Sequence, residues 1–373
     1  MSQTRPQNLT LLCLFLFFPL ISPCIAIQQQ NDNTKIKGMF VFGSSLVDNG
    51  NNNFLSNSIA KVNYFPYGID FPLGPSGRFT NGKNVIDLLG QKLNLSDYIP
   101  PFSDPSTNGS KLVNGVNFAS GGSGILDDTG ALAGNVTSLN QQIRNFEDYT
   151  LPELMEMELG SKSKEILAQF LFLVGSGGND YSLNYFMGLS NSNTSIEVFT
   201  ANLISNLAHH LMRLYNLGAS KFVLMAINPN GCSPMAKARV PTQDGCIQTL
   251  NRAVHMFNAE LRNLVDAIRP QMPGSNLVFV NSYKVIMDII KHPISKGFVD
   301  VKNSCCEISK ISEGGNGVLC KREGSICENR DEYVFFDGLH PTQAVNVVIA
   351  NKAFASEFQA EVYPFNIYNL SQM

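Results

Sequence analysis

Gly38-Met39-Phe40-Val41-Phe42-Gly43-Ser44-Ser45-Leu46-Val47-Asp48-Asn49-Gly50 is an apolar run that ends abruptly in small polar residues. The run at 38–43 predicts a strand buried on both faces, because it shows no alternation of apolar and polar side chains. Ligands of doubly wound α/β proteins bind at the carboxyl ends of such strands. Ser45, just beyond the run, is therefore a candidate nucleophile, with a turn or helix N-cap residue as the alternative interpretation.

The rest of the chain repeats this alternation of strand and helix. Further β-rich runs predict strands at 115–120, 169–175, 221–227 and 276–281. Helical patterns are predicted at 84–93, 138–149, 196–217, 247–269, 282–291 and 342–358. The order favours a three-layer α/β/α sandwich with a parallel five-stranded sheet. Stretches 44–82 and 297–331, rich in Gly, Pro, Asn and Cys, predict long surface loops.

Composition fits an ordinary globular protein. The chain has 373 residues, of which 44% are hydrophobic and 15% are charged, so it can bury a large core. Its formal net charge of -3 argues against nucleic acid and anionic membrane surfaces as partners. No internal repeat or linker appears, and we expect a single domain over 27–373.

The first residues predict export. Arg5 precedes an apolar stretch from Leu11 to Ile21, and Cys24 and Ala26 supply the small residues of a cleavage site. We therefore expect 1–26 to be a signal peptide and the mature chain to be secreted to the extracellular space. A membrane anchor is the alternative, but the apolar run is shorter than the roughly 20 residues that a spanning helix needs, and it contains Pro19.

The cysteines agree with export, because an even number remains after the signal is removed. These are Cys232, Cys246, Cys305, Cys306, Cys320 and Cys327. Cys232 and Cys246 form an easy local loop, which leaves the other four to staple 305–327. Zinc binding is the weaker alternative, since no CxxC pair occurs. Candidate glycosylation sequons begin at Asn94, Asn108, Asn135, Asn193 and Asn369.

Two glycine-rich segments follow predicted strands. Ser120 leads into Gly121-Gly122-Ser123-Gly124, where bare backbone N–H groups can approach a ligand closely. A phosphate loop is the rival interpretation, but both usual glycine spacings are missing. Gly175-Ser176-Gly177-Gly178-Asn179-Asp180-Tyr181 offers the Asn179 amide as a hydrogen-bond donor to an oxyanion, although Asn beside Gly is more often a turn residue.

Near the C-terminus, Asp337 and His340 lie three residues apart beside an apolar run. On a turn of helix they share a face, and the apolar run could bury the pair. The alternative is a structural, hydrogen-bonded histidine.

Together these segments resemble the plant GDSL esterase/lipase family of SGNH hydrolases. Blocks at 64–72, 77–82 and 327–330 extend the resemblance over nearly the whole mature chain. The resemblance implies a flavodoxin-like fold with Ser45 as nucleophile, His340 as base and Asp337 as its orienter. It also implies an oxyanion hole of the Ser45 N–H, the Gly121 N–H and the Asn179 side chain, with Gly124 as an alternative to Gly121, and no metal or organic cofactor.

The chain departs from the family pattern at two positions. Ser44 stands where the Gly-Asp-Ser-Leu motif has Asp, and Phe336 stands where Trp usually precedes the catalytic Asp. We expect hydrolysis of small-molecule, lipid or polymer esters. The alternatives are a non-catalytic or weakly active binding protein on the same fold, and an acyltransferase that uses the same residues. The natural ester and the oligomeric state stay open.

Overall fold

The computed structural model describes residues 36–158, 162–189, 194–239 and 245–373. The predicted signal peptide and the sequon at Asn193 lie outside these ranges. The main sheet has the order β1-β2-β3-β4-β7. Its strands are β1 (Gly38–Gly43), β2 (Phe170–Gly175), β3 (Lys221–Met225), β4 (Asn276–Val280) and β7 (Val362–Tyr363). A second, two-stranded sheet pairs β5 (Asp300–Ser304) with β6 (Tyr333–Phe335).

Four of the five predicted strands are confirmed as parallel neighbours, from β1 to β4. The predicted all-parallel five-stranded sheet is wrong, because the fifth strand is β7, which pairs antiparallel with β4. The segment 115–120 runs parallel to β1 but forms only isolated bridges, from Asn117 to Val41 on one side and to Pro101 on the other. On its outer side, the carbonyl groups of Asn117 and Ala119 accept from the Asn51 side chain, each at 2.8 Å, and the Asn117 carbonyl also accepts from the Phe102 N–H at 2.8 Å.

If the segment 115–120 is counted as a strand beside β1, the parallel part of the sheet has the order 115–120, β1, β2, β3, β4. The second element of the chain then lies outside the first. That is the order of flavodoxin-like sheets, whose ligands bind where the strand order reverses. Here the reversal falls between β1 and β2, at their carboxyl ends.

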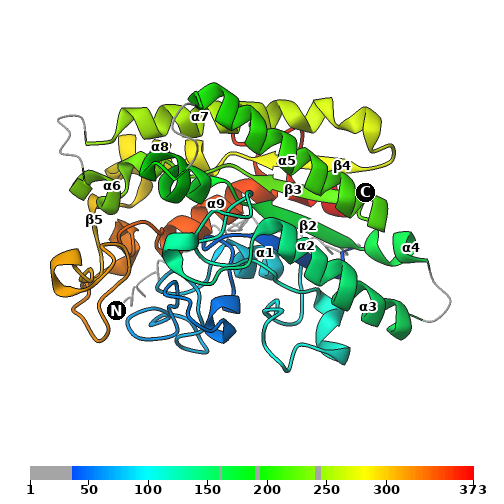
Figure 1. Ribbon diagram of the computed structural model, residues 1–373, viewed down its shortest axis with the longest axis horizontal. Helices are drawn as coiled ribbons and strands as arrows, with labels where there is room; N and C mark the ends of the chain where they lie inside the picture. The colour runs from blue at the N-terminus through cyan, green and yellow to red at the C-terminus, as the bar shows by residue number, and fades with distance from the viewer. Residues whose placement is uncertain (1–35, 159–161, 190–193, 240–244) are drawn as a thin grey trace, which may run out of the picture. The chain divides into compact units, whose positions relative to one another are not determined.

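Helices cover both faces of the sheet (Figure 1). They are α1 (Val85–Lys92), α2 (Leu139–Asn145), α3 (Leu151–Met157), α4 (Ser163–Leu167), α5 (Ile196–Leu217), α6 (Pro234–Arg239), α7 (Gln248–Ala267), α8 (Ser282–Lys291), α9 (Gln343–Ala355) and α10 (Ile367–Gln372). The six predicted helices are confirmed, with small shifts at their ends. Beyond α2 the chain stays helical through a π-turn at Phe146–Thr150 into α3, farther than predicted.

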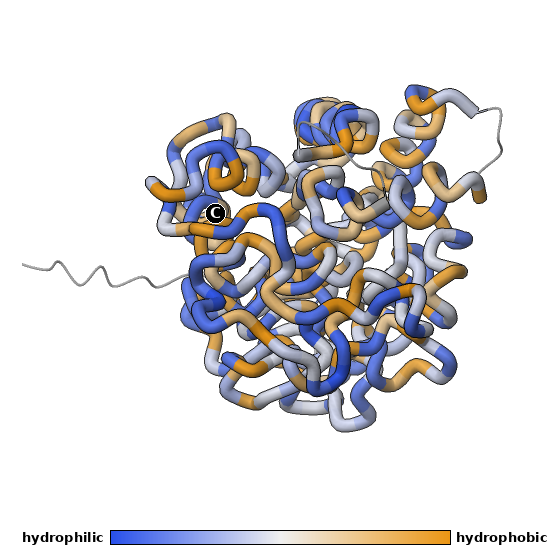
Figure 2. The backbone as a smooth tube through the Cα atoms, turned by 90° about the vertical axis from the view of Figure 1, so that its left-hand side faces the viewer, coloured by the Kyte–Doolittle hydropathy of each residue, from blue (hydrophilic) through white to orange (hydrophobic). Residues whose placement is uncertain are grey.

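The two layers of helices are buried against opposite faces of the sheet, because successive side chains of a strand point in opposite directions. Phe40 and Phe42 of β1 pack into one core with α2, α5 and α7. Met39 and Val41 pack into the other core with α1, α8, α9 and α10. In Figure 2, orange and blue residues alternate along the helical coils, as expected of helices with one face toward a core.

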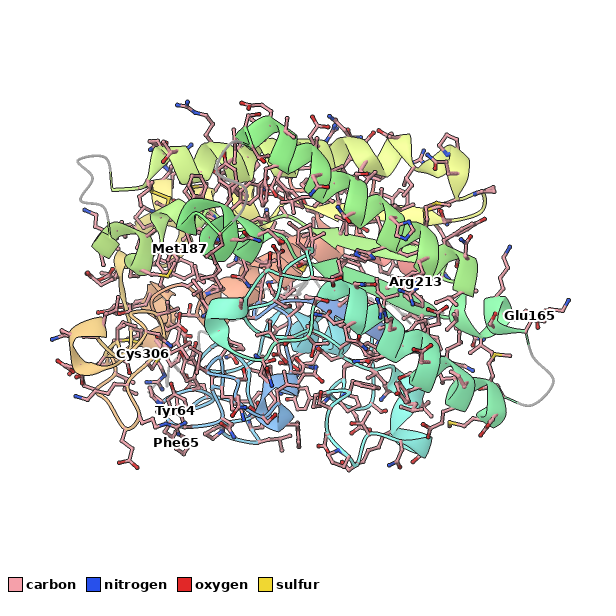
Figure 3. The ribbon with its side chains drawn as sticks, viewed as in Figure 1. Tyr64, Phe65, Glu165, Met187, Arg213 and Cys306 are labelled. Carbon is pink, nitrogen blue, oxygen red and sulfur yellow. A yellow bond between two sulfur atoms is a disulfide. The ribbon has the colours of Figure 1, made fainter. Side chains whose placement is uncertain are left out.

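The strands direct the following loops to one edge of the sheet. β2 follows α4 at the right of Figure 1 and runs left, toward the region where Met187 is labelled in Figure 3. Disulfides Cys305–Cys327 and Cys306–Cys320 staple the long segment after β5 at this side. The remaining pair is Cys232–Cys246, so the expected local loop and staple are confirmed. The prediction that 297–331 is a long loop is wrong at β5. Residues 300–304 form a strand there because they pair with β6.

Candidate active site

Ser45, His340 and Asp337 form one continuous chain of hydrogen bonds. Ser45 Oγ lies 2.8 Å from His340 Nε2, and His340 Nδ1 lies 2.8 Å from Asp337 Oδ2. Ser45 and His340 are 9% and 6% exposed, whereas Asp337 is fully buried. A base within hydrogen-bond reach of a hydroxyl, itself oriented by a carboxylate, is the arrangement that activates a serine for attack.

Close contact between strand ends positions Ser45. A Cβ on Gly43 would lie 2.2 Å from the carbonyl oxygen of Gly175, so only glycine lets β1 and β2 end side by side. The Gln142 side chain of α2 clamps the same residue, accepting from the Gly43 N–H at 2.7 Å and donating to its carbonyl at 2.9 Å. The turn that carries Ser45 therefore begins from a fixed point.

A tight turn after β6 positions Asp337 and His340. Asp337 Oδ1 accepts from the backbone N–H groups of Leu339 at 2.8 Å and His340 at 2.7 Å. The N–H of Phe336 donates to the carbonyl of His340 at 2.8 Å and closes the turn. The carboxylate therefore fixes the backbone and the imidazole together.

Two aromatic residues of the 44–82 segment contact Asp337 and His340. The hydroxyl of the fully buried Tyr67 donates to Asp337 Oδ2 at 2.6 Å and accepts from the N–H of Cys320 at 3.0 Å. Burial, followed by the neighbouring Asp337 charge, raises the pKa of Tyr67 well above its usual value, so it acts as a donor. Phe79 packs on the His340 ring with centroids 4.9 Å apart.

Sequence reasoning assigned Tyr67 and Phe79 no role, although both lie in blocks that carry the family resemblance. Tyr64 and Tyr67 pack in one hydrophobic cluster with Cys306 of the stapled segment, and Figure 3 labels Tyr64 and Cys306 on the same side of the molecule. Tyr64 Oη donates to the Cys320 carbonyl at 2.8 Å, which joins the two long loops.

The predicted oxyanion donors are arranged only in part as expected. Asn179 lines the cavity beside Ser45, and its Nδ2 donates to the Ser123 carbonyl at 2.9 Å, which leaves a second N–H for a ligand. The Gly121 N–H donates to Asp48 Oδ2 at 2.9 Å, so it is already engaged. Gly122 lines the cavity instead, and neither its N–H nor that of Ser45 makes a hydrogen bond to another described residue.

Two buried carboxylates hold the glycine-rich turn in place. Asp48 accepts from the N–H groups of Gly50, Asn51 and Gly121, and Asp180 accepts from those of Ile125 and Leu126. Burial raises the pKa of each carboxyl group to about 6. The N–H donors lower the pKa, but their effect is smaller than that of burial. The alternative Gly124 packs against Asp180, since a Cβ there would lie 2.5 Å from its oxygens.

Two cavities flank the Ser45–His340 pair. The larger, about 190 Å³, is mainly apolar; its lining includes Ile59, Phe79, Leu132, Leu183, Met187 and Val318. The smaller, about 60 Å³, lies across the ends of β1, β2 and β3 and is more polar. Ser45, Asn179, Leu339 and His340 line both. The two sides of an ester can therefore occupy separate spaces about one nucleophile.

Comparison with known sequences agrees with this geometry. The sequence model for the GDSL-like lipase/acylhydrolase family matches residues 39–353. The chain belongs to this family. It is 39% identical to GDSL esterase/lipase At1g29670 of Arabidopsis thaliana, over 90% of this chain and 91% of that protein. It is 37% identical to GDSL esterase/lipase At4g16230 of the same plant, over 91% of this chain and 92% of that protein.

Both departures from the GDSL-family pattern lie at this site. Phe336 is fully buried and packs edge-on against Tyr67, with ring centroids 5.5 Å apart, so it keeps the apolar wall of the usual Trp. Ser44 lines the smaller cavity and takes no part in the hydrogen bonds among Ser45, His340 and Asp337. The geometry of the three residues is therefore complete without a carboxylate at position 44.

Proposed function

We propose that this GDSL-family member is a secreted hydrolase that cleaves carboxylic esters of aliphatic acids through an acyl-enzyme. The observation that carries the proposal is the hydrogen-bond chain from Asp337 through His340 to Ser45, which ends at the mouth of an apolar cavity. An apolar lining favours an acyl chain, because burial contributes about 25 cal/mol for each Å² of apolar surface.

The reaction begins when His340 Nε2 takes the proton of Ser45 Oγ, which attacks the ester carbonyl. Asp337 stabilises the imidazolium, and His340 then gives the proton to the leaving alcohol. A water molecule, activated by the same imidazole, releases the acid from the acyl-enzyme. Tyr67 supports each step indirectly, because it holds the Asp337 carboxylate in the orientation that His340 needs.

The charge on the tetrahedral oxygen requires preorganised donors. We assign the Ser45 N–H and the free Asn179 N–H to this task, and we assign the third position to the Gly122 N–H in place of Gly121. The engagement of Gly121 with Asp48 and the place of Gly122 in the cavity wall support the exchange. Removal of one such donor typically lowers kcat by roughly 10²–10³.

We further propose that 1–26 is removed as a signal peptide and that 27–373 works as one extracellular domain. Three disulfides support an oxidising compartment. The sequon residues Asn94, Asn108, Asn135 and Asn369 are exposed, which supports glycosylation at these positions. Within the described ranges, no helix is long and apolar enough to cross a bilayer.

Labelling and turnover test the proposal together. The purified secreted protein is treated with a fluorophosphonate probe and assayed on p-nitrophenyl octanoate, beside Ser45→Ala. We expect labelling and hydrolysis that both depend on Ser45. If the intact protein is neither labelled nor active, the proposed hydrolase function is wrong and the binding-protein alternative gains support.

A further inference from the structure

The smaller cavity beside Ser45 holds polar side chains that have no partner in the protein. Ser176 is 7% exposed, and its Oγ has no hydrogen-bond partner among the described residues. The same holds for Oδ1 of Asn228. Neither Ser44 Oγ nor the side-chain amide of Asn230 makes a hydrogen bond within the described chain, whereas the Asn230 backbone N–H donates to the Asn228 carbonyl at 2.7 Å. Buried polar groups are nearly always paired, so such a group at a cavity wall points to a ligand.

These side chains are held in position by the backbone that carries them. After β3, both backbone groups of Ile227 bond the Asn258 side chain, at 2.8 and 2.9 Å. Asn251 Oδ1 accepts from the Gly231 N–H at 2.9 Å. The turn with Asn228 and Asn230 is thus anchored at both ends. The side-chain amides of these two residues can therefore bind a ligand without a large loss of backbone conformational freedom.

The cavity is also uncharged. Among its described lining residues there is no Lys, Arg, Asp or Glu, and His340 is the one titratable side chain. The usual family motif would place a carboxylate at position 44, in this wall. Ser44 supplies a neutral hydroxyl there, so the wall offers donors and acceptors but no counter-charge for a cationic or phosphate-bearing group.

The volume limits what fits. About 60 Å³ holds about four to six water-sized groups, which suits three carbons that carry hydroxyls. His340 lines both cavities, so an alcohol bound in this one also lies next to the group that protonates it as it leaves.

We propose that this cavity is the alcohol subsite and that Ser44, Asn228 and Asn230 select esters of small uncharged polyols, such as glycerol or the hydroxymethyl end of a sugar. The inference rests on the proposed esterase function and assigns the apolar cavity to the acyl chain. Hydroxyls of the alcohol pair with the free amides, and Ser176 joins them after rotation about its χ1 angle.

Esters with one acyl chain and different alcohols test the proposal. We compare kcat/KM for 1-octanoylglycerol, ethyl octanoate and octanoylcholine with the full secreted chain. We expect at least about a tenfold preference for the glycerol ester, since a site built for hydroxyls rejects analogues that lack them. Ser44→Ala and Asn230→Ala should each lower the glycerol-to-ethyl ratio about 3- to 10-fold, the effect of one lost hydrogen bond.

Three controls separate selection from damage. Ser44→Asp should raise the rate on octanoylcholine relative to the glycerol ester, whereas the neutral isostere Ser44→Asn should not. Asn263→Ala, on the exposed side of α7, should leave every ratio unchanged. A glycerol-to-ethyl ratio near one in the native protein, or variants that lower both esters equally, would overturn the alcohol subsite while the esterase function stands.

Binding separates this inference from the function on which it rests. Calorimetry with 1-O-octylglycerol, an ether that cannot be hydrolysed, is compared with octyl ethyl ether. We expect tighter binding of the glycerol ether and a loss of that preference in Asn230→Ala, whether or not the protein turns over esters. Equal binding of the two ethers overturns the subsite.

Discussion

Tyr67→Phe removes one hydroxyl from behind the candidate active site and leaves the ring in place. That hydroxyl donates to Asp337 Oδ2 at 2.6 Å and accepts from the Cys320 N–H at 3.0 Å, both in a fully buried setting. A hydrogen bond to a charged group contributes about 1.5–3 kcal/mol, and the Cys320 N–H loses its acceptor as well. We therefore expect the free energy of unfolding to fall by about 2–4 kcal/mol.

Catalysis should change in a way that simple destabilisation does not produce. Without the tyrosine donor, more of the Asp337 charge is directed to His340, so the protonated imidazole is favoured. If roughly half of the lost interaction is transferred, the acid limb of kcat/KM moves up by about 0.5–1 pH unit, since one unit corresponds to 1.36 kcal/mol. Below that limb, kcat/KM falls about 3- to 10-fold.

Tyr64→Phe is the matched control, because Tyr64 packs against Tyr67 and donates to the Cys320 carbonyl but makes no hydrogen bond to Asp337. Urea unfolding and pH profiles of kcat/KM on p-nitrophenyl octanoate give both readouts. We expect the control to lose about 0.5–1.5 kcal/mol and to keep its acid limb. Identical limbs in the two variants would refute a positioning role for Tyr67.

Three further perturbations address other parts of the site. Burial raises the pKa of Asp48 and Asp180 from 3.8 to about 6, so protonation of these carboxyl groups favours the folded state. Their contribution to stability is therefore present below about pH 4 and is lost as the pH rises through about 6. Urea unfolding should show the free energy of unfolding fall over this range, and Asp180→Asn should make the fall smaller. Cys306–Cys320 and Cys232–Cys246 each join residues 14 apart, so replacing either pair by Ser should lower the free energy of unfolding by about 3 kcal/mol. Only loss of Cys306–Cys320 should also shift the acid limb of kcat/KM. The same acid limb in both variants would count against the coupling through Cys320. Asn179→Ala should lower kcat roughly 10²–10³-fold on p-nitrophenyl octanoate with little change in KM, and a change in KM alone would exclude its role toward the oxyanion.

The sequence was sufficient to predict the layers of the fold and the residues at the ends of its strands. Buried parallel strands read as continuous apolar runs, and the small residues after them stand out against that background. For this reason β1 to β4 and the serine, asparagine and Asp–His segments were found where the structure has them. The two-residue β7 was not found, because so short a strand depends on pairing with β4 and carries no pattern of its own.

The sequence could not show which of the neighbouring glycines 121 and 122 has a backbone N–H that is free to bind an oxyanion. Gly121 and Gly122 are chemically identical, and which of their N–H groups is already engaged depends on a distant acceptor. Asp48 comes 73 positions earlier and takes the Gly121 N–H, which no local pattern indicates. The contact between Tyr67 and Asp337 spans 270 positions and depends on a stapled loop for its geometry, so it too is visible only in the folded chain.

The sheet and the loops contribute differently to the candidate site. The strands bring Ser45 and Asn179 to one edge, but Asp337 and His340 belong to a turn whose support comes from outside the main sheet. Tyr67 holds the Asp337 carboxylate, and Tyr67 is in turn held by the N–H of Cys320, which the Cys306–Cys320 disulfide fixes. The Asp337 carboxylate is thus two hydrogen bonds away from a backbone group that a disulfide fixes, so we expect the Cys306–Cys320 disulfide to affect the geometry of the candidate site as well as stability. We therefore expect a reduced chain that kept both cores to hold Ser45 at the end of β1 but to lose part of the support for Asp337, which would then depend on the hydrogen bonds within its own turn.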